Sequence, residues 1–274
     1  MIYLTSFKLS DKKSSCPNIY PYNVFRGREG KTFFFGGITV LYGDNGSGKS
    51  TILNLISNKL GIKGSEYATP NTYGNVDYMG RFIGECSFGM GEDEFGRTIR
   101  HIPDVSRYIK SEDILYEIKK IWQKGVLGDG MLYDLVTDGM DRQKAETLVD
   151  SVEGWKLLED KAFRQEKYSN GETSVQYFDE MLKPGGLYLL DEPEVSLSPS
   201  NQVYLSKKIN EMVRFFDCQF IIATHSPFML GELDSKIYDL DSRGYSEARW
   251  TDLENVRYFF RFFDKHKDEF EGLC

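Results

Sequence analysis

Residues 43–50 read G-D-N-G-S-G-K-S and directly follow the apolar run 38–42. This pattern is typical of a phosphate-binding loop between a buried strand and a helix. Glycines let the backbone turn tightly and point its N–H groups at phosphate oxygens, and a helix from about residue 49 to 59 would add its positive N-terminal end. The sequence therefore predicts a nucleoside triphosphate site, formed by Gly43, Asp44, Asn45, Gly46, Ser47, Gly48, Lys49, Ser50 and Thr51.

Two side chains of this loop have separate expected tasks. Lys49 would reach the β- and γ-phosphates, and the hydroxyl of Ser50 would ligate Mg²⁺. The alternative is a glycine-rich turn that binds no ligand. The strand pattern before the loop and the helix pattern after it favour the nucleotide site.

A carboxylate pair, Asp191 and Glu192, ends a second strand-like run at residues 187–190. At the carboxyl end of a buried strand beside a phosphate loop, Asp191 can hold Mg²⁺ directly or through water. Glu192 is then free to orient and deprotonate the attacking water. The alternative is an acidic turn without a catalytic role, because Pro193 also favours a turn.

Three further stretches match one superfamily in order and spacing: Y-S-N-G-E at 168–172, E-V-S-L-S-P at 194–199 and A-T-H-S-P at 223–227. With these motifs the chain resembles the ATP-binding-cassette (ABC) ATPases, specifically the SMC-like branch of stand-alone AAA-family ATPases. The resemblance spans roughly residues 30–240. It implies an α/β P-loop NTPase fold of the ABC type, with a mixed sheet, flanking helices, an antiparallel β edge and an inserted helical lobe. It also implies an ATPase that uses ATP and Mg²⁺.

The resemblance assigns further residues to the site. Ser169 and the N–H of Gly171 would contact the γ-phosphate held by the other subunit of a dimer, and residues 196–198 would cross the dimer interface. His225 would contact the γ-phosphate as a switch histidine. Ser169 also reads as an ordinary helix N-cap before the helical run 173–182, and a helix N-terminus aimed at phosphate serves both roles.

The domain organisation follows from the same patterns. We expect residues 1–274 to form one ABC-type ATPase domain, with 62–170 as an inserted irregular and helical lobe that carries the signature motif. Strand patterns fill residues 1–42, and helical periodicity begins at Ser111. The lobe is too short for a long coiled coil, so large-scale DNA tethering is not expected.

Some positions stay open. No Gln occurs between Ser50 and Ile121, so the glutamine that this superfamily places after a strand has no clear counterpart. A weak candidate is Glu85, in the strand-like stretch 81–88. Adenine could stack on an aromatic residue ahead of the loop, for which Tyr20, Tyr22 and Phe25 are equal candidates. The apolar residues of the tail predict a helix face that caps the core, with a partner-binding groove as the alternative; they are Trp250, Leu253, Val256, Phe259, Phe260, Phe262 and Phe263.

Composition limits the partners. The net charge of −8 and the pI near 5.1 do not support a broad nucleic-acid surface, although a local one stays possible. The four cysteines form no C-x-x-C pair, and no apolar run approaches the length of a membrane span, so we expect a cytoplasmic protein with reduced thiols and no membrane partner.

Two function classes follow. The first is a stand-alone ATPase that forms a homodimer on binding ATP and drives an unidentified effector protein or a nucleic-acid process, of the DNA-repair or antiviral-defence type. The second is the nucleotide-binding subunit of an ABC membrane transporter. Resemblance favours the first class for two reasons. Glu172 stands where transporter subunits usually carry Gln, and residues 196–198 read S-L-S where those subunits usually carry the interface loop S-A-L-D. A binding switch with negligible turnover is a third possibility, which Glu192 weakly opposes.

Overall fold

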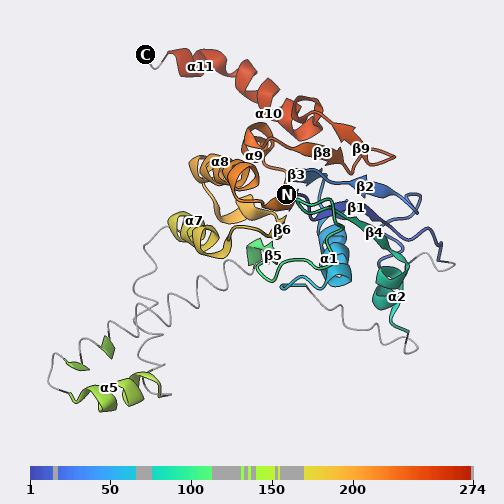
Figure 1. Cartoon of the computed structure of the whole chain (residues 1–274). Helices are drawn as coiled ribbons and strands as arrows, with labels where there is room; N and C mark the ends of the chain where they lie inside the picture. The colour runs from blue at the N-terminus through green and yellow to red at the C-terminus, as the bar shows by residue number, and fades with distance from the viewer. Residues whose placement is uncertain are drawn as a thin grey trace.

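The computed structural model describes residues 1–14, 18–65, 76–112, 131–132, 135–136, 140–151, 154 and 170–272. Within these residues, six strands form a mixed sheet in the order β5-β6-β7-β3-β8-β9 (Figure 1). Neighbouring strands are parallel except for β9, which runs antiparallel to β8. The strands are β5 (Arg107–Lys110), β6 (Leu187–Asp191), β7 (Gln219–Ala223), β3 (Ile38–Tyr42), β8 (Lys236–Asp239) and β9 (Ser246–Ala248).

A second sheet is built from the N-terminal part of the chain. Its order is β2-β1-β4, and both pairs are antiparallel. The strands are β1 (Leu4–Lys8), β2 (Thr32–Phe34) and β4 (Ser87–Met90). The predicted antiparallel β edge is therefore confirmed.

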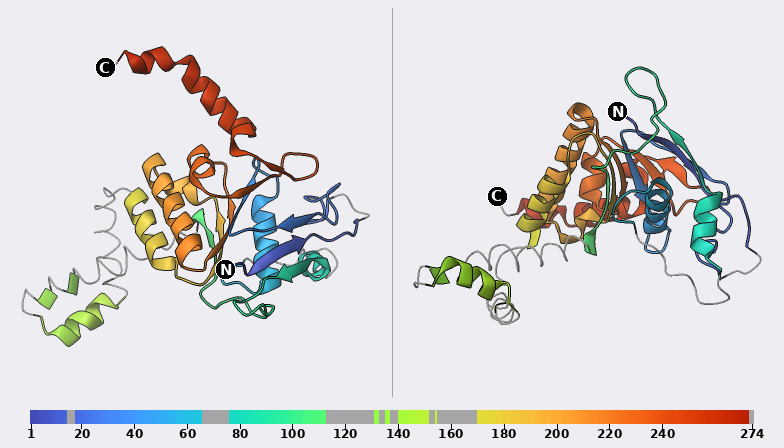
Figure 2. Two further views of the ribbon diagram at one scale, coloured as in Figure 1. Left: turned by 45° about the horizontal axis from the view of Figure 1, so that its top comes forward. Right: turned by 60° about the horizontal axis from the view of Figure 1, so that its bottom comes forward.

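Helices cover both faces of the six-stranded sheet (Figure 2). One face, with Ile221, packs on α1 and the small sheet; the other, with Phe220, packs on α7, α8 and α9. Because both faces are covered, the central strands are continuously apolar. The helices are α1 (Lys49–Leu60), α2 (Tyr78–Glu85), α5 (Arg142–Val149), α7 (Asn170–Met181), α8 (Pro199–Phe215), α9 (Pro227–Glu232), α10 (Glu254–Lys265) and α11 (Lys267–Glu271), with short 3₁₀ turns η2 (Pro193–Ser196) and η3 (Trp250–Asp252).

The stretch 81–88 was expected to be a strand, and this prediction is wrong. Residues up to Glu85 belong to α2, which begins after Asp77, whose side chain accepts a hydrogen bond from the N–H of Gly80. This N-cap favours a helix despite the apolar residues that follow. The strand β4 starts only at Ser87.

The boundary of the expected inserted lobe also needs correction. Within residues 62–170, β4 belongs to the small sheet and β5 pairs with β6 in the large one. An insertion can therefore begin only after Lys110. Most of the chain between 113 and 169 lies outside the described residues, so the single-domain organisation with a helical lobe stays a prediction.

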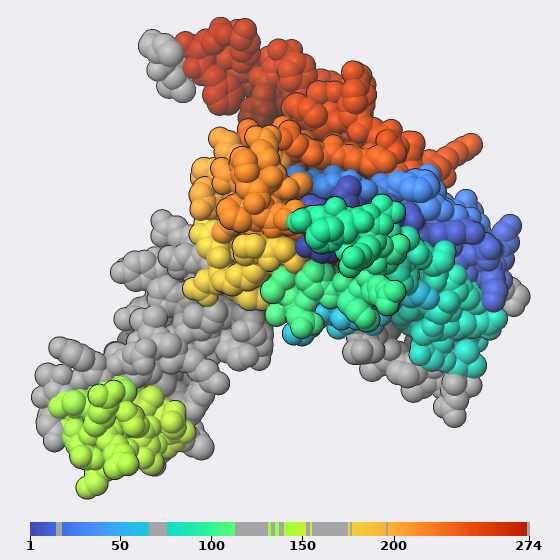
Figure 3. Space-filling model, in the orientation of Figure 1, coloured from blue at the N-terminus to red at the C-terminus, as the bar shows by residue number. Residues whose placement is uncertain are grey.

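The C-terminal segment packs on the core only through Leu253 and Val256, which confirms the expectation for the tail in part and corrects it for the aromatic residues. Only Leu253 and Val256 are buried, whereas Phe260 is 70% exposed. Figures 1 and 3 show α10 and α11 (red) extending away from the body, so the apolar face has no core to cover. The other exposed aromatic residues of α10 and α11 are Tyr258, Phe259, Phe262, Phe263 and Phe270. Among the described residues, no helix is both long and apolar enough to cross a bilayer.

Candidate nucleotide site

The phosphate loop connects β3 to α1, as predicted. Gly48 precedes α1 with φ +100°, a conformation that side chains rarely adopt, and a Cβ there would lie 2.9 Å from Cγ1 of Val24. Glycine is therefore required at this position. The first turn of α1 carries Lys49 and Ser50 at the positive end of the helix dipole, which favours an anion.

Lys49 lies across the loop. Its side chain is 4% exposed, and Nζ donates hydrogen bonds to the carbonyl oxygens of Gly43 at 2.7 Å and Asp44 at 3.2 Å. Nζ also lies 3.7 Å from Oε1 of Glu192. One buried ammonium thus links the loop to the end of β6, at the point where a bound phosphate would meet both.

Ser50 and Asp191 lie side by side, as the predicted metal ligands should. The Ser50 hydroxyl donates to Oδ1 of Asp191 at 3.1 Å. Neighbouring ligands of an octahedral Mg²⁺ are about 2.9 Å apart, so both oxygens fit one ion. No cluster of three His, Cys, Asp or Glu side chains among the described residues could hold a metal. The hydrogen-bonded oxygens of Ser50 and Asp191 suit an ion that completes its shell with phosphate and water, as Mg²⁺ does at nucleotide sites.

Tyr108 is a neighbour of this pair that the sequence did not indicate. It lies on β5, and its hydroxyl donates to Oδ2 of Asp191 at 3.0 Å. Burial raises the pKa of Asp191 above its ordinary value, although the hydrogen bonds from Ser50 and Tyr108 oppose this shift. No motif marks Tyr108; its role depends on β5 lying next to β6, which only the sheet order reveals.

Glu192 occupies a strained position at the end of β6. Its φ of 48° is left-handed, which is unusual for a residue other than glycine, and its N–H donates to the carbonyl of Ala223 at 2.9 Å. Such strain is often found at functional sites. Nδ1 of His225 lies 3.8 Å from Oε1 of Glu192 and 3.6 Å from Oε1 of Glu194. The predicted base and the predicted switch histidine are therefore adjacent.

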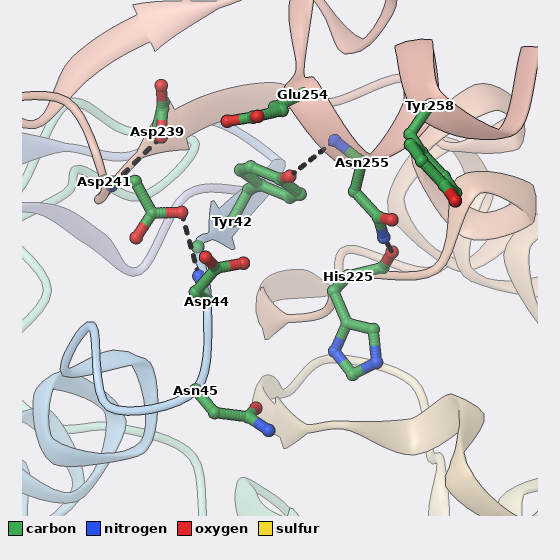
Figure 4. A pocket seen from close by; sticks show the side chains of 10 residues that line it. Tyr42, Asp44, Asn45, His225, Asp239, Asp241, Glu254, Asn255 and Tyr258 are labelled. Atoms are coloured by element: carbon green, nitrogen blue, oxygen red, sulfur yellow. Dashed lines mark hydrogen bonds between the residues drawn. The ribbon is translucent and has the colours of Figure 1, made fainter. Parts of the chain in front are cut away.

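A cavity of about 680 Å³ opens beside the start of the loop. Figure 4 shows Asp44 and Asn45 on one side, His225 on another, and Glu254, Asn255 and Tyr258 from α10. The carboxylates of Asp44, Asp239, Asp241 and Glu254 make its lining acidic. Burial, followed by repulsion from Asp44 and Asp239, raises the pKa of Asp241. This acidic wall disfavours phosphate on that side and favours the side of Lys49.

The remaining predicted site residues are only partly placed. Gly171 lies in the first turn of α7, and Ser169 lies outside the described residues. Their contact with a nucleotide of another subunit stays a prediction. The predicted interface segment 196–198 begins at the last residue of η2, and the Ser198 side chain caps α8 by accepting from the N–H of Asn201.

The Glu85 carboxylate bonds to neighbouring side chains of α2 and the N-terminal segment, and not to residues of the phosphate loop. It accepts hydrogen bonds from Ser10 at 2.6 Å and Tyr22 at 2.9 Å, and pairs with Arg81. It therefore holds α2 to the N-terminal segment. The residue that would replace the missing glutamine therefore stays open.

The three aromatic candidates for adenine stacking differ in their surroundings. Phe25 is buried and stacks on Phe82, with ring centroids 5.6 Å apart, and Tyr22 meets the same ring edge-on. Both are used in packing. Tyr20 is 36% exposed, and its hydroxyl lies 3.3 Å from Oγ1 of Thr51 in α1. Only Tyr20 keeps an accessible ring next to the loop.

Comparisons with known proteins identify a family for this chain. The family model of the AAA domain matches residues 20–177, and the model of the AAA ATPase domain matches residues 159–230. The chain is similar to the tungstate uptake system ATP-binding protein TupC of Peptoclostridium acidaminophilum, at 28% identity over 228 residues, covering 80% of this chain and 89% of the relative.

Solved structures with similar folds include two classes. An ATP-binding cassette of an ABC transporter in its ADP conformation has a TM-score of 0.49 at 15% identity, covering 95% of this chain and 99% of that chain. The SMC head domain from Thermotoga maritima has a TM-score of 0.39 at 16% identity, covering 87% and 94%. The family assignment itself comes from the sequence models. Because the AAA domain model matches more than half of the chain, the protein belongs to the AAA domain family.

Proposed function

We propose that this protein hydrolyses ATP with Mg²⁺ between two copies of the chain, and that turnover drives an unidentified effector protein. One observation carries the proposal: Lys49 and Glu192, from the phosphate loop and the end of β6, lie 3.7 Å apart beside the hydrogen-bonded pair Ser50 and Asp191. Phosphate binding, metal binding and water activation would therefore meet in one place.

In this proposal each residue has one task. Lys49 binds the β- and γ-phosphates, Ser50 and Asp191 hold Mg²⁺, and Glu192 orients and deprotonates water. His225, next to Glu192, contacts the γ-phosphate. Mg²⁺ would supply charge neutralisation on the phosphates, as it does in related chemistry.

The test uses Glu192→Gln and Lys49→Ala. Glu192→Gln keeps the size of the side chain but removes the base, so it should bind ATP normally and hydrolyse it at least ~10²-fold more slowly. Lys49→Ala should lose ATP affinity, because it removes the charge that faces the phosphates. Phosphate release and nucleotide titrations measure the two effects separately. Unchanged turnover in Glu192→Gln would exclude Glu192 as the base.

The dimer is tested by light scattering. Glu192→Gln with saturating Mg-ATP should double in mass, because hydrolysis no longer releases the closed dimer, and Ser169→Arg should block this change by placing a bulky group at the contact. A monomeric mass under these conditions, together with full ATPase activity in Ser169→Arg, would exclude the two-subunit site.

A transporter subunit is the second candidate function, and the similarity to TupC favours it. A nucleotide-binding subunit would form a stable, detergent-dependent complex with an integral membrane protein. Affinity purification from solubilised membranes separates the candidates: recovery of such a complex supports the transporter, and recovery of the chain without one supports the stand-alone ATPase. A nucleic-acid effector is not supported by the net charge of −8.

A further inference from the structure

Glu194 is a buried carboxylate to which the proposed reaction assigns no task. It lies in η2, three residues after Asp191, and is 7% exposed. Its Oε1 accepts hydrogen bonds from Oγ1 of Thr224 at 2.8 Å and from the N–H of His225 at 3.0 Å. Thr224 and His225 directly follow β7, so this side chain connects the ends of two neighbouring strands.

The backbone of His225 is held on both sides. Its N–H donates to Glu194, and its carbonyl accepts from Nδ2 of Asn255 at 3.2 Å. Thr224 extends this network, because its hydroxyl also accepts from the N–H of Ser226 at 3.1 Å. With the peptide groups fixed, the His225 imidazole lies near Glu192, although this side chain is itself 45% exposed.

Packing alone does not explain a carboxylate at this position. Burial raises the pKa of Glu194, and Oε2 is buried with no hydrogen-bond partner among the described residues. An ionised group in such surroundings opposes folding unless its charge is used. Glutamine would fill the same space without that cost and could accept both bonds at its one amide oxygen, but a neutral amide would hold the two donors more weakly than a carboxylate does.

We propose that Glu194 is a positioning residue: its buried carboxylate fixes the backbone of His225 so that the imidazole faces Glu192 and the γ-phosphate of bound ATP. The inference rests on the proposed ATPase function. Glu194 touches neither nucleotide nor metal, and it acts only through His225. Its removal should therefore lower kcat while leaving ATP affinity unchanged, and it should have no effect where His225 is already absent.

A double-mutant cycle tests this. Glu194→Gln should reduce kcat on the order of 10-fold with an unchanged Kd for a fluorescent ATP analogue. His225→Ala should be slower still, and the double variant should be no slower than His225→Ala. Glu211→Gln, the same change on the exposed side of α8, is the matched control and should leave kcat as in the wild type. Independent effects of Glu194→Gln and His225→Ala, or full activity in either, would overturn the proposal.

A second pair of variants covers the case in which Glu194→Gln does not fold. Thr224→Val removes the hydroxyl donated to Glu194, whereas Thr224→Ser retains it. We expect Thr224→Val to lower kcat and Thr224→Ser to restore it, and equal activities would overturn the proposal. Failure of the proposed function is recognised separately, because the wild type would then show no Mg-dependent turnover that Glu192→Gln removes.

Discussion

The carboxyl edge of the six-stranded sheet buries polar side chains, whereas the C-terminal helices α10 and α11 expose aromatic ones. At the sheet edge, polar groups such as Lys49, Asp191 and Glu194 are buried and hydrogen-bonded. Along α10, aromatic side chains such as Phe260 are exposed. Buried polar side chains need hydrogen-bond partners at fixed distances, and several strands and helices supply them at the sheet edge. A periodic apolar sequence predicts a helix with an apolar face, but it does not specify what packs on that face.

The largest expected effect compares one aromatic side chain from each environment. Phe220, in β7, is fully buried and stacks on Tyr188, with ring centroids 5.2 Å apart. Phe220→Ala should lower the free energy of unfolding by about 3–5 kcal/mol, because it leaves a cavity in the core. The same change at exposed Phe260 should stay within about 0.5 kcal/mol. Urea unfolding measures both, and a large loss at Phe260 would mean that α10 packs on a surface in solution.

The second-largest effect is expected from a substitution of Asp191, whose carboxylate is buried. Asp191→Asn should reduce ATP hydrolysis more than about 100-fold, since it weakens a proposed metal ligand. The ligand-free variant should nevertheless melt no lower than the wild type. Because burial raises the pKa of Asp191, its folded state loses stability as the pH rises from the unfolded pKa through the folded one.

Asparagine does not ionise, so Asp191→Asn avoids at neutral pH the stability that the wild type loses when buried Asp191 ionises. The difference in stability between the two proteins should disappear as the pH falls below the unfolded pKa of aspartate. Thermal melts of both proteins across pH check this. A variant that melts far below the wild type at neutral pH would show that the carboxylate stabilises the sheet edge instead.

Tyr108→Phe should have a smaller effect. It removes the hydroxyl that donates to Oδ2 of Asp191 and keeps the ring in the core. We expect about a 10-fold loss of ATPase activity at limiting Mg²⁺ and about 1 kcal/mol of stability. Tyr238→Phe, a similar loss of a hydroxyl away from the loop in β8, serves as the control. Equal activity losses in the two variants would remove Tyr108 from the site.

The smallest effect should follow truncation after Arg257. This cut keeps the buried residues Leu253 and Val256, and also Asn255, whose side chain bonds to His225. The unfolding free energy should change by about 0.5 kcal/mol or less, and ATP affinity should not change. A destabilised or aggregated product would show that the aromatic residues of α10 and α11 are covered in the intact protein.

Sequence alone determined the phosphate loop, Asp191 and Glu192, and the strands and helices next to them. These motifs are local: a Gly-rich turn between a strand and a helix has few alternatives, and residues 38–42 and 187–190 are apolar because helices cover both faces of their sheet. The sequence also placed His225 just after an apolar strand, which ends at Ala223, whereas its contact with the γ-phosphate stays a prediction.

Only the tertiary structure decided the rest. Whether Tyr108 reaches Asp191 depends on β5 lying beside β6, and their hydrogen bond joins residues 83 positions apart. The helix at 78–85 depended on a cap at Asp77 rather than on apolar content. The aromatic face of α10 predicted a helix correctly but not its surroundings. Local spacing is set by the backbone, whereas contacts between distant segments are set by how the sheet is ordered and what packs on it.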